Sequence, residues 1–267
     1  MALSKQLTRG VGILRSGFTP ACLRDLNLDD PRTTERRREI IQANSFLRRI
    51  YGEWYSLLSD RIPPGSDRVL ELGSGAGFFA DYVPDLITSE VLICGGVKAV
   101  LDGRQLPLRS SSLRAIVMID VFHHIPEIRP FLDEAVRCLR SGGALLLVEP
   151  WLSRWSRLIY THLHHEPFDP NAEAWAFPST GPLSGANVAL PWIVFERDKM
   201  VLARDYPNLA IREVRPMMPF RYLVSGGISM RQLMPEAAFP VWRQIDGWLS
   251  RWPSSWPMFA LIDVRRS

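Results

Sequence analysis

The sequence has few cysteines and almost no lysines. Its three cysteines, Cys22, Cys94 and Cys138, are odd in number, far apart and outside any Cys-x-x-Cys arrangement. This pattern argues against both a disulfide framework and a cysteine zinc site. It fits a reducing compartment, so we expect a cytoplasmic protein.

A long uninterrupted apolar run is also missing. The first 20 residues are broken by arginine and glycine. They contain neither the apolar core of a secretory signal nor the roughly 20 apolar residues of a membrane span. Residues 1–32 have weak periodicity and are expected to form an irregular lead-in.

Positive charge comes almost entirely from arginine, because Lys5, Lys98 and Lys199 are the only lysines. The formal net charge is +4. A basic balance is compatible with nucleic acid or an anionic membrane surface. It is equally compatible with a basic composition that reflects no binding partner, so the net charge alone identifies no partner.

Apolar periodicity organises the rest of the chain. From Thr33 it predicts one amphipathic helix that stops at Pro63. We expect residues 1–63 to be a lead-in and helical cap, and residues 64–267 to be the main domain. Strands are predicted at 68–72, 86–91, 97–101, 115–120, 144–149, 209–214 and 258–264, and helices at 128–139, 193–204 and 239–252. Strands that alternate with helices predict an α/β fold with a doubly covered, mostly parallel sheet.

Residues 151–192 interrupt this alternation with many aromatic residues, histidines, prolines and glycines. A segment this long after a strand is usually functional, so we expect a lid or acceptor-binding insertion. The candidates for contact with an acceptor are His164, His165, Asn187 and Trp192. The run 161–166 has adjacent His and Glu residues rather than the i, i+4 spacing of a helical zinc pair, so no metal is expected.

The chain is organised around residues 69–77, where an apolar strand ends at Glu71 and a glycine-rich turn follows. A strand, a glycine turn and a helix bring the backbone close to a nucleotide-like ligand. The dinucleotide fingerprint fails because Phe78 occupies the position of its third glycine. No Gly-Lys-Ser/Thr follows, which excludes a Walker loop. A glycine turn without a ligand stays open as an alternative. The candidates for ligand contact in this turn are Gly73, Ser74, Gly75 and Gly77.

The pattern Glu-x-Gly-x-Gly-x-Gly after a first strand resembles the first motif of class I S-adenosylmethionine-dependent methyltransferases. Glycine would let the backbone lie against the methionine end of this cofactor. Free N–H groups at the start of a following helix would suit its carboxylate. The carboxylate of Glu71 would suit its ammonium group.

Two further acids fit the same cofactor. Glu90 follows Glu71 at close to the ~20-residue spacing of a ribose-binding acid, although an ordinary surface glutamate is the alternative. Residues 102–108, Asp-Gly-Arg-Gln-Leu-Pro-Leu, resemble a later motif of this family. The resemblance implies that Asp102 accepts from the adenine amino group and that a backbone N–H near Gly103 meets the ring.

A fourth element is the apolar strand that ends at Asp120 and is followed by His123 and His124. In this family the equivalent loop borders the methyl group and the acceptor, and His124 matches the commoner histidine position. A histidine there suits a general base, because its pKa lies near neutral. The alternative that this loop histidine has only a structural role, as a capping or packing residue, stays equally open. Asp120 is a candidate for both cofactor binding and catalysis.

Together these motifs cover residues 67–150. The resemblance implies a seven-stranded sheet in the order 3-2-1-4-5-7-6 with the last strand antiparallel, and S-adenosylmethionine as cofactor. It also implies methyl transfer to a small-molecule or lipid-like acceptor. The motifs of enzymes that methylate DNA bases or protein arginines are missing, so no DNA partner is expected.

Two alternatives remain. One is a degenerate methyltransferase fold that acts as a binding or scaffold subunit. The other is an RNA methyltransferase, which only the net charge favours. The Trp-rich face of residues 239–252 is expected to pack in the core. It also leaves peripheral contact with the inner face of a membrane open.

Overall fold

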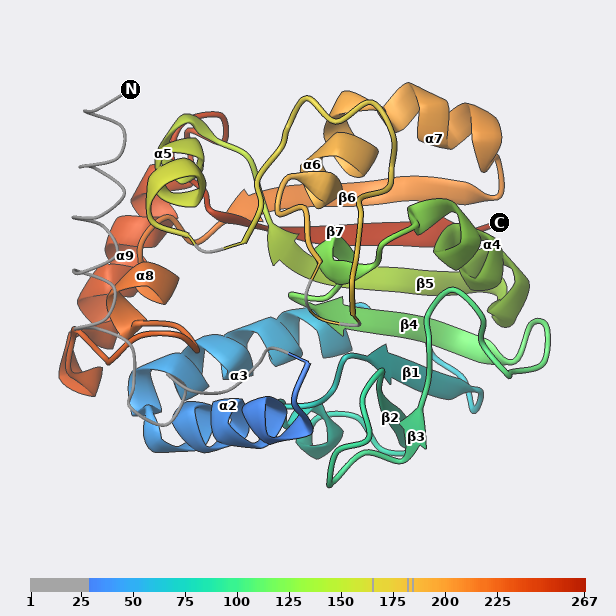
Figure 1. The fold of residues 1–267 in the computed structure, drawn as a ribbon, viewed down its shortest axis with the longest axis horizontal. Helices are drawn as coiled ribbons and strands as arrows, with labels where there is room; N and C mark the ends of the chain where they lie inside the picture. Colours follow the sequence, from blue (N-terminus) through green and yellow to red (C-terminus); the bar gives the residue numbers. More distant parts are fainter. Residues whose placement is uncertain (1–28, 165, 182, 184) are drawn as a thin grey trace.

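The computed structural model describes residues 29–267 except 165, 182 and 184. Its centre is a seven-stranded sheet in the order β3-β2-β1-β4-β5-β7-β6 (Figure 1). β7 runs antiparallel to both of its neighbours, and the other pairs are parallel. The predicted fold class, strand order and antiparallel last strand are therefore confirmed. The strands are β1 (Arg68–Leu72), β2 (Leu86–Glu90), β3 (Ala99–Val100), β4 (Leu113–Ile119), β5 (Leu139–Pro150), β6 (Leu209–Met217) and β7 (Phe259–Arg266).

The central strands are buried on both faces. In β5 the consecutive residues Leu145, Leu146 and Leu147 are all 0% exposed. A continuous apolar run of this kind is typical of a sheet strand covered by helices on both sides. β5 begins earlier than predicted, and β3 keeps only two residues of the predicted strand 97–101.

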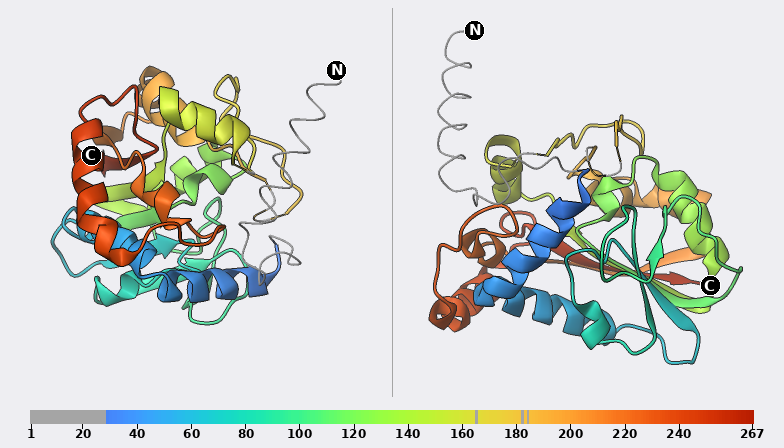
Figure 2. Two further views of the ribbon diagram at one scale, coloured as in Figure 1. Left: turned by 90° about the vertical axis from the view of Figure 1, so that its left-hand side faces the viewer. Right: turned by 60° about the horizontal axis from the view of Figure 1, so that its bottom comes forward.

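Helices cover both faces of the sheet (Figures 1 and 2). One face carries α4 (Ile128–Cys138), α6 (Leu190–Trp192), a π-helical turn (Ile193–Arg197) and α7 (Lys199–Asp205). The opposite face carries α3 (Ser45–Ser59), α8 (Arg221–Ser225) and α9 (Phe239–Leu249). α2 (Pro31–Ala43) precedes α3, and α5 (Arg154–His162) follows β5.

The single helix predicted from Thr33 is wrong, because Asn44 divides it into α2 and α3. Asn44 has an extended backbone, and its side-chain oxygen accepts a hydrogen bond of 2.9 Å from the N–H of Leu47. Its side-chain amide donates to the carbonyl of Ser225 at 2.8 Å. Asparagine is among the best residues to cap a helix N-terminus, so the break has a local cause.

The helix expected after the glycine turn is also wrong. Only a 3₁₀ turn, Phe79–Asp81, follows it. Pro84 disfavours helical backbone at Val83, and Asp85 has a φ of 60°. No long helix therefore presents its N-terminus to a ligand carboxylate at this point.

Much of the Trp-rich face of residues 239–252 is exposed, which corrects the expectation in part, because Trp242 does pack against the core. Val241, Trp248 and Trp252 are 59%, 55% and 45% exposed. The helix instead buries Phe239 and Leu249 against the sheet. In the part of the chain that the structure describes, no helix combines the length and apolar character needed to cross a membrane.

Candidate functional site

A cavity of about 1280 Å³ opens at the carboxyl ends of β1, β2 and β4. The strand order changes direction between β1 and β4, and ligands of open α/β sheets bind at such a point. Pockets for a single ligand usually measure about 300–1,000 Å³, so this one has room for a cofactor and an acceptor together. Helices α2, α3, α5 and α8 all contribute to its lining.

The glycine turn forms one wall of this cavity. Gly73 has a φ of +69°, and a side chain there would run into Val121, so this position requires glycine. Ser74 is fixed to β2, because its N–H donates to the Ser89 carbonyl at 2.8 Å and its hydroxyl accepts from the Ser89 N–H at 3.1 Å. Gly73, Ser74 and Gly77 line the cavity.

Gly75 does not line the cavity. A Cβ atom there would meet Thr34 at 2.5 Å and Glu90 at 2.6 Å. Its carbonyl accepts hydrogen bonds from the guanidinium of Arg38. A side chain at position 75 is therefore excluded by α2 and by Glu90, and Gly75 has no direct contact with the cavity.

Glu71 and Glu90 lie side by side at the ends of β1 and β2 and line the cavity. Burial raises the pKa of Glu71 to about 7, with a smaller contribution from the charge of Glu90, although a hydrogen bond from Ser74 lowers it. Burial also raises the pKa of Glu90, although its carboxylate accepts a hydrogen bond of 2.8 Å from the N–H of Val91. Two buried carboxyl groups next to each other suit a cationic ligand.

Asp102 and Gly103 line the cavity beyond β3. The Asp102 carboxylate forms a 2.7 Å ion pair with Arg104 and accepts a hydrogen bond of 2.9 Å from the Arg104 N–H. These bonds hold the pKa of Asp102 below its usual value. The carboxylate is ionised and stays an acceptor at neutral pH.

Asp120 directly follows β4, has a left-handed conformation with a φ of 60° and lines the cavity. Such backbone is uncommon outside glycine and is concentrated at functional sites. Burial is the main reason why the pKa of Asp120 is raised to about 6. The charge of His123 lowers this pKa, and the charges of Glu166 and Glu149 contribute to raising it.

His123 and His124 lie on a 3₁₀ turn, Phe122–His124, directly after β4. His123 is buried and does not line the cavity. Its Nδ1 lies 2.8 Å from the carboxylate of Glu149, and its Nε2 lies 3.4 Å from that of Glu166. Burial lowers the pKa of His123, but the two carboxylates raise it more, so that it lies well above its usual value.

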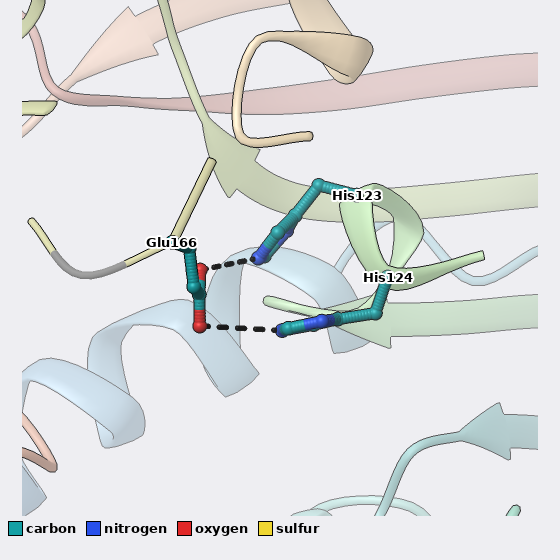
Figure 3. Close-up of side chains that lie close together, drawn as sticks. All are labelled: His123, His124 and Glu166. Carbon is teal, nitrogen blue, oxygen red and sulfur yellow. Dashed lines mark ion pairs between the residues drawn. The ribbon is translucent and has the colours of Figure 1, made fainter. Parts of the chain in front are cut away.

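His124 lines the cavity. Its Nδ1 lies 3.1 Å from the Gly185 carbonyl, and its Nε2 lies 3.6 Å from Glu166. Burial and the neighbouring His123 lower the pKa of His124 to about 4. Both imidazoles point at the carboxylate of Glu166, which comes from the loop after α5 (Figure 3).

The predicted acceptor residues of the insertion divide into three groups. His164 lines the cavity, and His165 lies outside the described residues. Asn187 is buried, and its side chain bonds to the backbone of Asp169. Trp192 packs against the core cluster that also contains residues of α4 and α7. Neither Asn187 nor Trp192 lines the cavity, so we remove both from the acceptor contacts.

Sequence reasoning missed Glu166 and Arg37. Glu166 closes the histidine-rich run that drew attention, but only the fold brings it to His123 and His124. Arg37 lies in the run of three arginines 36–38, within the helix that the apolar period predicts from Thr33. It lines the cavity and, among the described residues, makes no hydrogen bond or ion pair.

The fold and the place of the cavity define a class I S-adenosylmethionine-dependent methyltransferase fold. Residues 70–147 match the family model of the methyltransferase domain. No curated protein sequence matches the chain.

Two solved structures share this fold over most of their length. One is geranyl diphosphate C-methyltransferase from Streptomyces coelicolor A3(2), in complex with Mg²⁺, geranyl diphosphate and S-adenosyl-L-homocysteine. It has 13% sequence identity and a TM-score of 0.51 over 83% of this chain and 81% of that chain. The other is a geranyl diphosphate methyltransferase in complex with geranyl diphosphate and sinefungin. It has 14% identity and a TM-score of 0.50 over 83% of this chain and 79% of that chain. At this identity the likeness concerns the fold.

Proposed function

We propose that the protein transfers a methyl group from S-adenosylmethionine to a small-molecule or lipid-like acceptor. The observation that carries the proposal is the composition of one cavity. At one end it joins a glycine turn to Glu71, Glu90 and Asp102, and at the other end it is mainly apolar. The apolar end is lined by Ile159, Tyr160, Leu163, Tyr222, Leu223, Ile228, Met230, Met258 and Phe259.

The acidic residues of the polar end, taken in the order β1, β2 and β3, suit successive parts of S-adenosylmethionine. Glu71 would accept from the ammonium group and Glu90 from the ribose hydroxyls. Asp102 would accept from the adenine amino group. Because no long helix follows the turn, we assign the cofactor carboxylate to Arg37, the cation that α2 brings to the cavity.

The cofactor, when bound, supplies an electrophilic methyl group. The chain's own contribution is then to align the acceptor with that methyl, which is worth about 7–11 kcal/mol in favourable cases. Asp120 and His124 line the same cavity and would contact the acceptor. The apolar walls would hold the rest of the acceptor and exclude water.

We propose the cytoplasm as the compartment, with contact to a membrane through α9.

Calorimetry with S-adenosylmethionine and S-adenosylhomocysteine tests this function directly. We expect both to bind the full-length protein in a one-to-one complex. Glu90→Ala should weaken binding about tenfold or more, because it removes a charged acceptor from the ribose. Glu39→Ala is the matched control, since Glu39 is an exposed carboxylate on α2, and it should bind as the parent does.

The absence of heat with either ligand would overturn the proposal and favour the scaffold alternative. Equal affinity of Glu90→Ala and the parent would show instead that the ribose lies elsewhere in the cavity.

A further inference from the structure

Three side chains converge beside the cavity in a way that the proposed function does not require. His123 and His124 come from the turn after β4, and Glu166 comes from the loop after α5. Their ligand atoms all lie within 4.8 Å of one another. Figure 3 shows the two rings aimed at the two oxygens of one carboxylate. Side-chain exposures of 1%, 15% and 12% show that all three are largely withdrawn from solvent.

The partners of the other ring nitrogens fix the orientation of both imidazoles. His124 Nδ1 faces the carbonyl of Gly185, which can only accept, so this nitrogen carries a proton and donates. His123 Nδ1 faces Glu149, whose carboxylate already accepts the N–H groups of Val121 and Phe122 at 2.8 Å each. It therefore donates as well. His124 Nε2 is then left to present a lone pair towards Glu166. His123 lies between two carboxylates, and its Nε2 carries a proton towards Glu166 that a metal ion would displace.

A lone pair that faces a carboxylate is repelled unless a proton or a metal ion lies between them. The Nε2 to Glu166 distances of 3.4 and 3.6 Å exceed the roughly 2.7–3.2 Å of an N–H···O hydrogen bond. Two ligands that each lie ~2.1 Å from a tetrahedral ion are separated by about 3.4 Å. The two observed spacings are therefore close to the separation of ligands that share one ion, and all three ligand atoms lie within 4.8 Å of one another.

We propose that His123, His124 and Glu166 bind a divalent first-row transition metal ion of the zinc type. Two imidazoles and one carboxylate form a common three-ligand set that leaves a coordination position open. Histidine ligands usually donate their second N–H to a carboxylate or a carbonyl, as Glu149 and Gly185 provide here. Magnesium prefers an all-oxygen shell, so it does not suit this set.

The open position faces the cavity, because His124 and Glu166 line it together with Asp120. An oxygen atom of the acceptor would complete the coordination there. This consequence rests on the proposed function, whereas binding of the ion itself does not. It changes the role of the two histidines from candidate bases to ligands.

Titration of the metal-free, full-length protein with Zn²⁺, in a form without a histidine tag, tests the site. We expect one equivalent to bind tightly by competition with a chromophoric chelator, and Mg²⁺ to leave that binding unchanged. Co²⁺ should give the visible absorption bands of a site with nitrogen and oxygen ligands.

His124→Gln and Glu166→Gln should abolish tight Zn²⁺ binding and the Co²⁺ bands. His162→Gln is the matched control, because His162 is an exposed histidine four residues before Glu166 in the chain, and it should keep both. Glu149→Gln places an amide against His123 Nδ1 and forces its proton to Nε2. As a positioning variant it should weaken binding by about 10- to 100-fold. Circular dichroism and binding of S-adenosylhomocysteine to each variant verify that the fold persists.

Two outcomes would overturn the metal site. The parent could bind no Zn²⁺ in saturable form, or folded His124→Gln and Glu166→Gln could bind it as the parent does. If S-adenosylhomocysteine still binds in those experiments, only the metal site is lost. If Zn²⁺ binds and S-adenosylhomocysteine does not, the metal site stands and the proposed function falls.

Discussion

At the scale of the residue, buried charge sets the character of the site. Glu71 and Asp120 have raised pKa values because burial disfavours their ionised forms. Asp120 also holds a backbone conformation that favours glycine. Neither ionised side chain stabilises the folded protein without ligand, because a raised carboxyl pKa means that the fold disfavours the charged form. A cationic ligand between these groups would offset that cost.

The pKa of Glu71 predicts how cofactor affinity depends on pH. With a pKa of about 7 in the free protein, Glu71 is largely protonated below that pH. A bound ammonium group favours the carboxylate and lowers this pKa, so binding releases a proton below pH 7. Affinity for S-adenosylhomocysteine should therefore rise with pH up to about 7, by at most tenfold per pH unit, and then level off.

Calorimetry between pH 5.5 and 8.0 measures this dependence. Glu71→Gln should bind more weakly above pH 7 and show a flat profile, whereas Glu39→Gln should behave as the parent. An unchanged slope in Glu71→Gln would assign the titration to another group.

At the scale of the element, the break at Asn44 positions the site. Because α2 ends there, α3 can pack on the sheet while α2 reaches the glycine turn. Thr34 then lies against Gly75, and Arg38 binds its carbonyl. Arg37 is brought to the cavity by the same turn of helix. The apolar period was correctly predicted over α3, whereas in α2 the predicted Ala43 is exposed and Ile41 is buried instead. The interruption between the two helices depends on one capping side chain.

The exposed face of α9 predicts contact with membranes. Trp248 and Trp252 stack edge to face at 5.0 Å and stay about half exposed, with Arg243 and Arg251 on the same helix or next to it. An amphipathic surface of this kind binds anionic lipid by its apolar and basic residues together. The double variant Trp248→Ala/Trp252→Ala should lose most sedimentation with anionic vesicles.

Met200→Ala serves as the control for that experiment, because Met200 is an exposed apolar residue on α7, across the sheet. A parent protein that does not sediment with anionic vesicles would remove the membrane contact altogether.

At the scale of the whole molecule, the N-terminal helices are part of the core. α3 buries seven residues, Phe46, Leu47, Ile50, Tyr51, Trp54, Tyr55 and Leu58, and these pack in one cluster with β1, β4 and β5. The expected division at residue 63 stays a proposal about sequence organisation. The packing shows that the sheet needs α3 to cover one of its faces.

Truncation tests this dependence. A chain of residues 64–267 should lack a cooperative thermal transition, because it exposes the sheet face that α3 covers. A chain of residues 29–267 is the control and should unfold cooperatively, as monitored by circular dichroism. Cooperative unfolding of the 64–267 chain would show that the two parts are separable.

The sequence by itself determined the order of the strands and the residues that we propose for the cofactor end. Local signals in the sequence are the apolar period, the spacing of the glycines and the acidic residues at strand ends. A parallel sheet brings the carboxyl ends of its strands to one edge. Glu71, Glu90, Asp102, Asp120 and His124 could therefore be predicted as neighbours, and they line one cavity. Only the tertiary structure decided that Arg37 reaches the cavity, that Asn187 and Trp192 do not, and that Glu166 meets two histidines. Those outcomes depend on how an irregular loop and a capped helix pack against the sheet, and no periodic pattern encodes that packing.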